Sequence, residues 1–283
     1  VYKPDLPNAS KTSLDESLKI LAGMVSSPGL SITAVNAERP VVLAELRERA
    51  GPQTAVQNAT RELFFAGQRL ANRAPIGTPE TLSAATPQML QLFHQRWYRP
   101  EQTVIVIAGD GDPAMFEELL NKHFAQWQGK GEAGTIPDFG QPQEIADISR
   151  VLVEPTLPRF ISMVVARPWE QVEDTIVYNQ QILIDLLALQ LINRRLEARA
   201  RAGGSYLQAS VGQDDVSRSI DGTFINIVPL GDDWEAALED VRAVIADATT
   251  KAPSEADIGR EIAEFDAALA IGVESYQTEA ARK

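Results

Sequence analysis

Two glutamates, Glu38 and Glu45, have the spacing that would place two carboxylates on one face of a helix. They lie seven residues apart, and at 3.6 residues per turn a helix returns to the same face after about two turns. Carboxylates that point the same way could take part in metal binding or acid–base chemistry. An ordinary surface helix also explains the pattern, because glutamate favours helices and Arg49, four residues after Glu45, can form a solvated ion pair. The spacing alone favours this second interpretation.

Histidine and cysteine chemistry is limited in this chain, which has His94, His123 and no cysteine. No H-x-x-E-H or H-E-x-x-H spacing occurs, so the chain alone cannot assemble the usual histidine-based zinc site. The lack of cysteine excludes disulfides, thiolate metal sites and a cysteine nucleophile. Both histidines fall in predicted helices among apolar residues, and we interpret them as structural. The Gly-Asp-Gly-Asp run at 109–112 predicts a turn and a helix cap, because the remaining ligands of a calcium loop are missing.

Length, composition and charge define the class of protein. The 283 residues predict about two domains, and 44% hydrophobic with 23% charged residues is typical of a packed globular chain. The net charge of −13 would repel phosphate backbones, so nucleic acid is excluded as a partner. No run approaches the ~20 apolar residues of a membrane span.

Hydrophobic periodicity and helix caps predict an alternation of helices and short strands. We expect a first helix that Ser13 begins, a second over 34–50 that Pro40 starts or kinks, and a third over 54–71. Thr78, Thr86 and Asp112, each followed by proline, predict three more helix starts. The predicted strands are 103–108, 151–153, 160–165, 206–211 and 223–228, and the later predicted helices are 174–201, 233–248 and 254 onward.

This alternation favours the α+β class, with two αβ domains that each consist of a mainly antiparallel sheet covered by helices. Residues 129–142 are rich in glycine and lack periodicity, so we expect the linker there. The predicted organisation is a first domain over 1–130, a linker over 131–145 and a second domain over 146–283.

An ordered series of motifs resembles one known family. Glu38-Arg39, Val42 and Glu45 resemble the family's E-R-x-x-V-x-x-E helix, and 75–80 resemble its P-x-G-T-x-E segment. Residues 93–112, 191–196 and 203–206 resemble a later stretch of the first domain and the start of the second. On these motifs the chain resembles the insulinase/pitrilysin family of zinc metallopeptidases, whose members carry an inverted H-x-x-E-H motif. It resembles the longer bacterial members with signal peptides and four such domains.

The resemblance implies an internal fragment, in which the first peptidase-like domain lacks its N-terminal part and the second is truncated. It implies that Glu45 is the third zinc ligand and that Glu38 is a carboxylate behind the ligand set, where it orients the ligands. The family's two histidines and general-base glutamate have no counterpart here. We expect them before Val1 in the intact protein; the alternative is a non-catalytic relative.

A second pair of residues is suggested by the family's use of an arginine and a tyrosine seven residues apart to hold substrate. Arg199 and Tyr206 fit this spacing, whereas alignment on Arg195-Leu196 would make Arg201 the equivalent. Arginines near a helix end also commonly interact with the helix dipole, so a structural role stays open.

The function that these inferences favour is peptide hydrolysis by the intact protein. The resemblance implies zinc in the intact enzyme, a chamber formed with the remaining domains or a partner subunit, peptide or unfolded polypeptide substrates and a periplasmic location. The fragment alone is expected to bind no stoichiometric zinc and to be inactive. The alternatives are a non-catalytic partner subunit or scaffold that binds peptides at a sheet edge, and an unrelated α+β binding module.

Overall fold

The computed structural model describes residues 2–276 apart from residues 7, 9, 110 and 144–147. Contacts divide the chain into unit 1 (Val1–Arg49, Pro75–Pro137 and Tyr276–Lys283) and unit 2 (Ala50–Ala74 and Asp138–Ser275). The segment Ala50–Ala74 therefore groups with unit 2 although it precedes the glycine-rich linker. Among the described residues, no helix combines the length and apolar character needed to cross a lipid bilayer.

Unit 1 is built from helices. They are α1 (Lys11–Ser26), α2 (Ile32–Glu48), α4 (Pro79–Ala84), α5 (Pro87–Trp97), the 3-10 helix η2 (Pro100–Gln102) and α6 (Pro113–Phe124). The predicted caps Thr78, Thr86 and Asp112 are confirmed, since the side chain of each accepts a backbone N–H from the first helical turn. The prediction for α1 is wrong by three residues, because Ser10 and not Ser13 accepts the hydrogen bond that caps the helix.

Helices α1 and α6 form the core of unit 1. Leu14, Leu18 and Leu119 are buried between them, with further apolar side chains around them. At the edge of this core Asp15 accepts hydrogen bonds from Lys122, and His123 Nε2 lies 2.6 Å from Asp15 Oδ1. This contact supports the structural interpretation of His123.

Two expected strands are not strands in the structure. Residues 103–108 and 151–153 have strand-like sequences, but neither segment pairs with another among the described residues. Val104 and Val106 are 87% and 81% exposed, while Ile107 packs on the α1–α6 core. A strand needs a partner for its backbone groups, and β-branched residues alone do not supply one.

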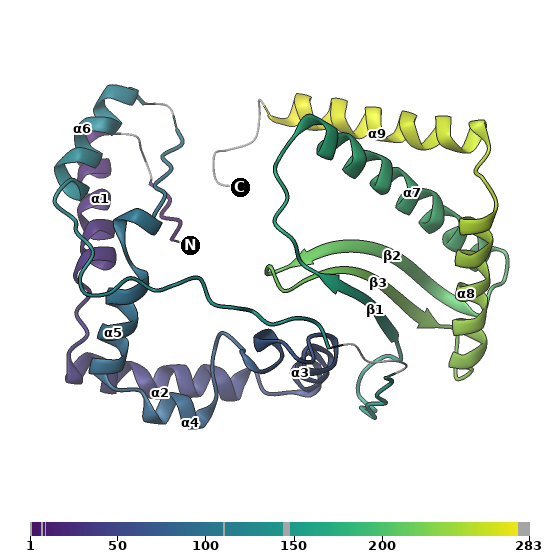
Figure 1. Cartoon of the computed structure of the whole chain (residues 1–283), viewed down its shortest axis with the longest axis horizontal. Helices are drawn as coiled ribbons and strands as arrows, with labels where there is room; N and C mark the ends of the chain where they lie inside the picture. The colour runs from purple at the N-terminus through teal and green to yellow at the C-terminus, as the bar shows by residue number, and fades with distance from the viewer. Residues whose placement is uncertain (1, 7, 9, 110, 144–147, 277–283) are drawn as a thin grey trace. The chain divides into compact units, whose positions relative to one another are not determined.

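Unit 2 contains one antiparallel sheet with helices on its faces (Figure 1). The strands, in the order β1-β3-β2, are β1 (Ile161–Pro168), β2 (Tyr206–Val216) and β3 (Ile220–Pro229). The helices are α3 (Pro52–Phe64), the 3-10 helix η1 (Arg69–Asn72), α7 (Ile176–Arg201), α8 (Trp234–Thr250) and α9 (Glu255–Tyr276). The predicted α+β class, with an antiparallel sheet covered by helices, is confirmed.

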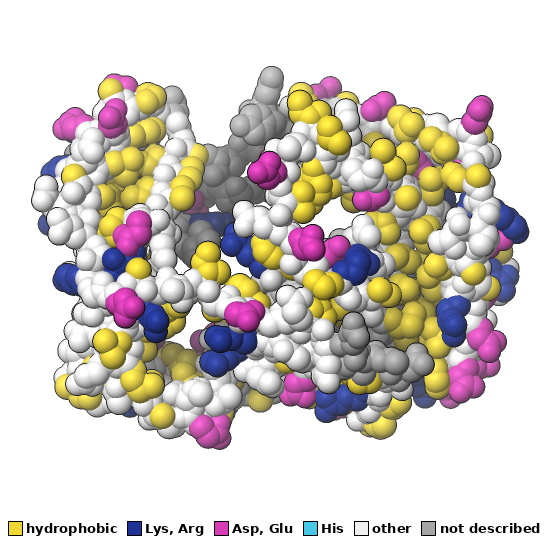
Figure 2. Space-filling view, viewed as in Figure 1, with side chains coloured by type: hydrophobic (Ala, Val, Ile, Leu, Met, Phe, Trp, Pro, Cys, Tyr) yellow, Lys and Arg dark blue, Asp and Glu magenta, His cyan; other side chains and the backbone are white. Residues whose placement is uncertain are grey.

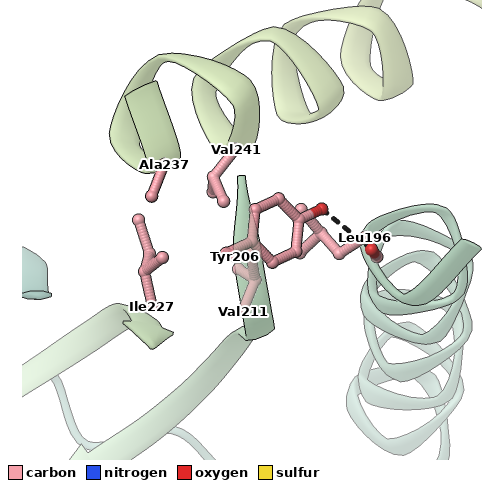
Figure 3. Close-up of a cluster of buried hydrophobic side chains, with 6 residues drawn as sticks. All are labelled: Leu196, Tyr206, Val211, Ile227, Ala237 and Val241. Atoms are coloured by element: carbon pink, nitrogen blue, oxygen red, sulfur yellow. Dashed lines mark hydrogen bonds between the residues drawn. The ribbon is translucent and has the colours of Figure 1, made fainter. Parts of the chain in front are cut away.

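The alternation of side chains along each strand divides the apolar residues between two cores. Odd-numbered residues such as Val211 and Ile227 pack with Leu196 of α7 and Val241 of α8 (Figure 3). Even-numbered residues such as Val216, Ile220 and Phe224 face the other side, where they pack against residues within 64–71. Tyr206 is an exception, because a register shift follows it in β2, and it packs in the first core. The strand pattern therefore explains why a segment before the linker belongs to unit 2.

One buried ion pair connects α7 to α9. Glu261 is 3% exposed, and its two carboxylate oxygens accept hydrogen bonds of 3.0 and 3.2 Å from Arg194. Arg194 also donates to Glu264 at 2.5 Å. Because a charge buried without a partner is costly, this arginine determines where α9 lies along α7.

Tyr206→Phe should lower the free energy of unfolding by about 1 kcal/mol, because it deletes one buried hydrogen bond. The Tyr206 hydroxyl, which Figure 3 shows within the core, donates to the Leu196 carbonyl at 2.8 Å. Urea denaturation would measure the change, with Tyr178→Phe on the exposed part of α7 as the matched control. Equal effects of the two substitutions would contradict this account of the core.

Lowering the pH should destabilise unit 1 through His94. This histidine stacks on Tyr98 with ring centroids 4.5 Å apart, and its Nε2 atom is buried without a hydrogen-bond partner among the described residues. Burial lowers the pKa of His94 below the ordinary value of 6.5, although hydrogen bonds to the backbone of Met24 and Val25 oppose this. The unfolded chain therefore binds the proton first, and stability falls as the pH drops below about 6.5.

His94→Gln should remove this contribution. Denaturation of both proteins between about pH 7.5 and 5.5 would show a smaller pH dependence for the variant. A titration of the His94 imidazole by NMR at or above its ordinary pKa would show that the premise is wrong.

Candidate functional site

Helix α2 carries both glutamates of the predicted site. Ser31 caps it by accepting the Ala34 N–H at 3.1 Å, so the helix runs from Ile32 to Glu48 with Pro40 in its interior. The prediction that Pro40 could start this helix is therefore wrong. The Ser31 cap, nine residues earlier, and the packing of α2 on α4 hold the helix despite the hydrogen bond that proline removes.

Arg39 fixes α2 against the end of α4. Its guanidinium donates to the Leu82 carbonyl at 3.0 Å and to the Ala85 carbonyl at 2.6 Å. Carbonyls at the end of a helix lack partners within the helix, so a cation is a favourable partner there. Arg39 thus positions the helix on which Glu38 and Glu45 lie.

The carboxylates of Glu38 and Glu45 are accessible to solvent. The Glu45 side chain is 47% exposed and forms an ion pair of 2.5 Å with Arg49, which confirms the predicted solvated pair. Glu38 is exposed and makes no hydrogen bond or ion pair with the described residues. Neither carboxylate is sequestered in packing, and their roles at a metal site stay predictions.

A zinc ion needs more ligands than α2 supplies. Catalytic zinc sites use three protein ligands, and no three His, Cys, Asp or Glu side chains of the described residues come together in a group that could hold a metal. The two histidines lie on α5 and α6, where His94 stacks on Tyr98 and His123 contacts Asp15. The chemistry of Glu45 fits one position of a zinc site, but the described residues do not complete one.

Arg199 and Tyr206 lie at the corner between α7 and β2. Tyr206 is 1% exposed and its hydroxyl is bound to Leu196. Arg199, whose side chain is 46% exposed, donates to Asp240 Oδ1 at 2.7 Å, and Asp240 Oδ2 accepts the Ser205 N–H at 3.0 Å. These contacts tie the α7–β2 corner to α8.

The electrostatics of this corner follow from burial and from the Arg199–Asp240 pair. Burial raises the pKa of the Tyr206 hydroxyl, Asp240 raises it further and Arg199 opposes both. Burial also disfavours ionisation of Asp240, but hydrogen bonds from Arg199 and Ser205 outweigh it and lower the pKa of that carboxyl. At neutral pH the corner therefore holds a neutral phenol beside a charged pair.

These contacts support the structural interpretation of Arg199 and Tyr206. The phenol is already engaged in the interior, and Arg201, the alternative equivalent, is exposed and pairs with Glu197 at 2.5 Å. A role in substrate binding stays a prediction for both residues.

The sequence did not reveal Asp240 as part of this corner. The available signal is the Gly203-Gly204 pair that follows the arginines of α7. Gly203 has φ +87°, and a Cβ on Gly204 would lie 2.9 Å from the Arg199 carbonyl and 3.1 Å from Asp240 Oδ2. The glycines therefore indicate a close approach, although only the structure shows that Asp240 is the partner.

Comparison with known sequences relates the chain to zinc proteases. The probable zinc protease PqqL of Escherichia coli is 25% identical over 203 residues, which are 72% of this chain and 22% of the relative. The uncharacterized zinc protease ML0855 of Mycobacterium leprae is 31% identical over 127 residues, 44% of this chain and 28% of the relative. The matched part of this chain thus spans less than a third of each of these relatives.

Comparison with solved structures supports the fold. The crystal structure of the periplasmic protease PqqL from Escherichia coli covers 98% of this chain with a TM-score of 0.82 and 22% identity, and the match is 31% of that chain. At this identity the likeness concerns the fold alone.

A family model described as the peptidase M16 inactive domain matches residues 84–265. The match begins at the end of α4, so α2 and its two glutamates lie outside it. This model matches more than half of the chain, and the sequence relatives are named zinc proteases. The resemblance to the insulinase/pitrilysin family is therefore confirmed, and the chain belongs to the peptidase M16 family.

Proposed function

We propose that this chain is one part of a zinc metallopeptidase that hydrolyses peptides or unfolded polypeptides, and that it is inactive alone. The observation that carries the proposal is the match of residues 84–265 to the inactive domain of a family whose relatives here are zinc proteases. The sequence contains no H-x-x-E-H segment, so the metal motif would come from residues outside it.

In this proposal Glu45 is the third zinc ligand, and two histidines and a general-base glutamate lie elsewhere in the intact protein. The support is that the Glu45 carboxylate is accessible and that Arg39 holds its helix on α4. Zinc, when bound, would activate water for attack on a peptide bond. Glu38, which has no partner among the described residues, would orient the ligands from behind.

The remaining domains of the protein, or a partner subunit, would complete a chamber around the peptide substrate. We also propose a periplasmic location, since the similar Escherichia coli protein is described as periplasmic. Contact of Arg199 and Tyr206 with substrate would require the Tyr206 hydroxyl to leave the Leu196 carbonyl, so the structural role has better support.

A non-catalytic scaffold or partner subunit of the same fold is the second candidate. Its support is the inactive-domain match together with two outer strands, β1 and β2, that pair only with β3 among the described residues. An extended peptide could add to either edge without a metal. The coding sequence upstream of Val1 separates the candidates: an H-x-x-E-H motif favours the peptidase, and a signal peptide or start codon directly before Val1 favours the scaffold.

Glu45→Gln in the full-length protein should abolish zinc retention and peptide hydrolysis, because it removes a charged ligand. Glu48→Gln is the matched control on the exposed part of the same helix and should change neither. Glu38→Gln should lower metal affinity or activity by about 10–100-fold. Metal content and turnover of a fluorogenic peptide are the measurements, and a Glu45→Gln enzyme with normal values would overturn the assignment.

The chain of 283 residues alone should not bind zinc stoichiometrically, since three protein ligands are needed and no three possible ligands of the described residues come together. Equilibrium dialysis followed by elemental analysis would measure this. Tight binding of one zinc ion per chain that Glu45→Gln abolishes would refute the view that the other ligands lie elsewhere.

A further inference from the structure

Parts of α7 and α9 carry large apolar side chains in contact with solvent. On α7, Ile176, Leu183 and Ile184 are 78%, 60% and 59% exposed. On α9, Leu269, Ile271 and Val273 are 66%, 67% and 70% exposed. We call these six residues the α7–α9 surface.

These residues point to more than one side of each helix. Successive residues are about 100° apart around a helix, so Leu183 and Ile184 face different directions, as do Leu269 and Ile271. A helix that covers one core needs only one apolar stripe, and a helix that is apolar all round is normally buried. The stripe of α7 that packs in the core of unit 2 lies in its later turns, at Leu189, Ile192 and Leu196. The exposed apolar residues of the earlier turns therefore do not serve to cover this core.

The exposed halves of the two helices lie at the same end of unit 2. Arg194, late in α7, binds Glu261 and Glu264, which lie early in α9. The two helices are antiparallel (Figure 1). The early turns of α7 and the late turns of α9 thus extend in the same direction. Figure 2 shows hydrophobic side chains gathered at the surface over this end.

Every charge on the surrounding helix turns is negative. No lysine or arginine occurs over 168–193 or 261–276. Asp185, Asp266 and Glu274 lie among the exposed apolar residues, and no cation of the described residues forms an ion pair with them. An apolar surface with an acidic rim is complementary to an apolar segment with basic residues at its sides.

We propose that the α7–α9 surface binds a helical segment of another polypeptide that is apolar on one face and flanked by lysine or arginine. A second copy of this surface would bring like charges together, and an anionic membrane would be repelled. An amphipathic helix docks on an apolar surface through anchor side chains about one turn apart on its own apolar face. The exposed apolar residues of the α7–α9 surface would contact those anchors. The proposal does not depend on zinc chemistry.

The test compares two labelled helical peptides of about 18 residues, or five turns, with leucine at the same positions and either lysine or glutamate elsewhere. Fluorescence anisotropy with the full chain should show saturable binding of the leucine–lysine peptide, at least about tenfold tighter than that of the leucine–glutamate peptide. Added salt should weaken it. No binding, or equal binding of both peptides, would overturn the proposal.

Two sets of variants locate the site. Ile184→Asp should weaken binding of the leucine–lysine peptide by at least about tenfold, and Ile136→Asp, at an exposed apolar residue of unit 1, should not. The double variant Asp266→Asn and Glu274→Gln should weaken binding of the leucine–lysine peptide and should not weaken binding of the leucine–glutamate peptide. All these positions are exposed, and circular dichroism would verify folding.

Self-association provides the competing outcome. If light scattering shows a dimer that Ile184→Asp dissociates, the occupant is a second copy and the proposal is wrong. The peptide-binding measurements depend on neither metal content nor hydrolysis, so failure of the zinc assignment and failure of this proposal are separately visible.

Discussion

The structure of unit 2 depends on burying both faces of a sheet that has three strands among the described residues. One face packs on α7 and α8, where Leu196, Ile227 and Val241 are fully buried. The other face needs its own cover, and residues of α3 and η1 supply it around Ile220. Gln68 reinforces this cover by donating to the Ser219 and Gly140 carbonyls. Since apolar area removed from water is the main driving force for folding, a sheet with two apolar faces recruits segments from both sides of the linker.

A metal site, like the core of unit 2, requires residues from distant segments to come together. This explains why the glutamates of α2 are not by themselves an active site. A helix determines which side chains share a face, and Arg39 determines where this helix lies on α4. A metal site also requires ligands from other elements at distances set by the ion. Glu38 and Glu45 satisfy the first condition, and the second depends on residues that the proposed intact peptidase would supply. The membership of the peptidase M16 family and the chemistry of this chain are therefore separate conclusions.

The proposed functions share one physical feature, which is that each requires contact with residues outside this chain. A zinc centre completed from outside, an open sheet edge and the α7–α9 surface each need a partner to bury what the chain leaves accessible. The α7–β2 corner differs, because Arg199 pairs with Asp240 and the Tyr206 hydroxyl donates to the Leu196 carbonyl within unit 2. This difference separates side chains that stabilise the fold from side chains that remain free to make contacts.

The sequence by itself determined many of the helix starts of this protein, three strands of its sheet, and its family. Threonine or aspartate before proline located helix starts at Thr78, Thr86 and Asp112, because capping depends on neighbouring residues alone. The motif series identified the family for a similar reason, since it follows the order of the chain. Only the tertiary structure decided that 103–108 is not a strand, that Ala50–Ala74 joins unit 2, and that Asp240 is the partner of Arg199. These outcomes depend on which distant segments meet, and burial and pairing between distant segments are properties that no local pattern contains.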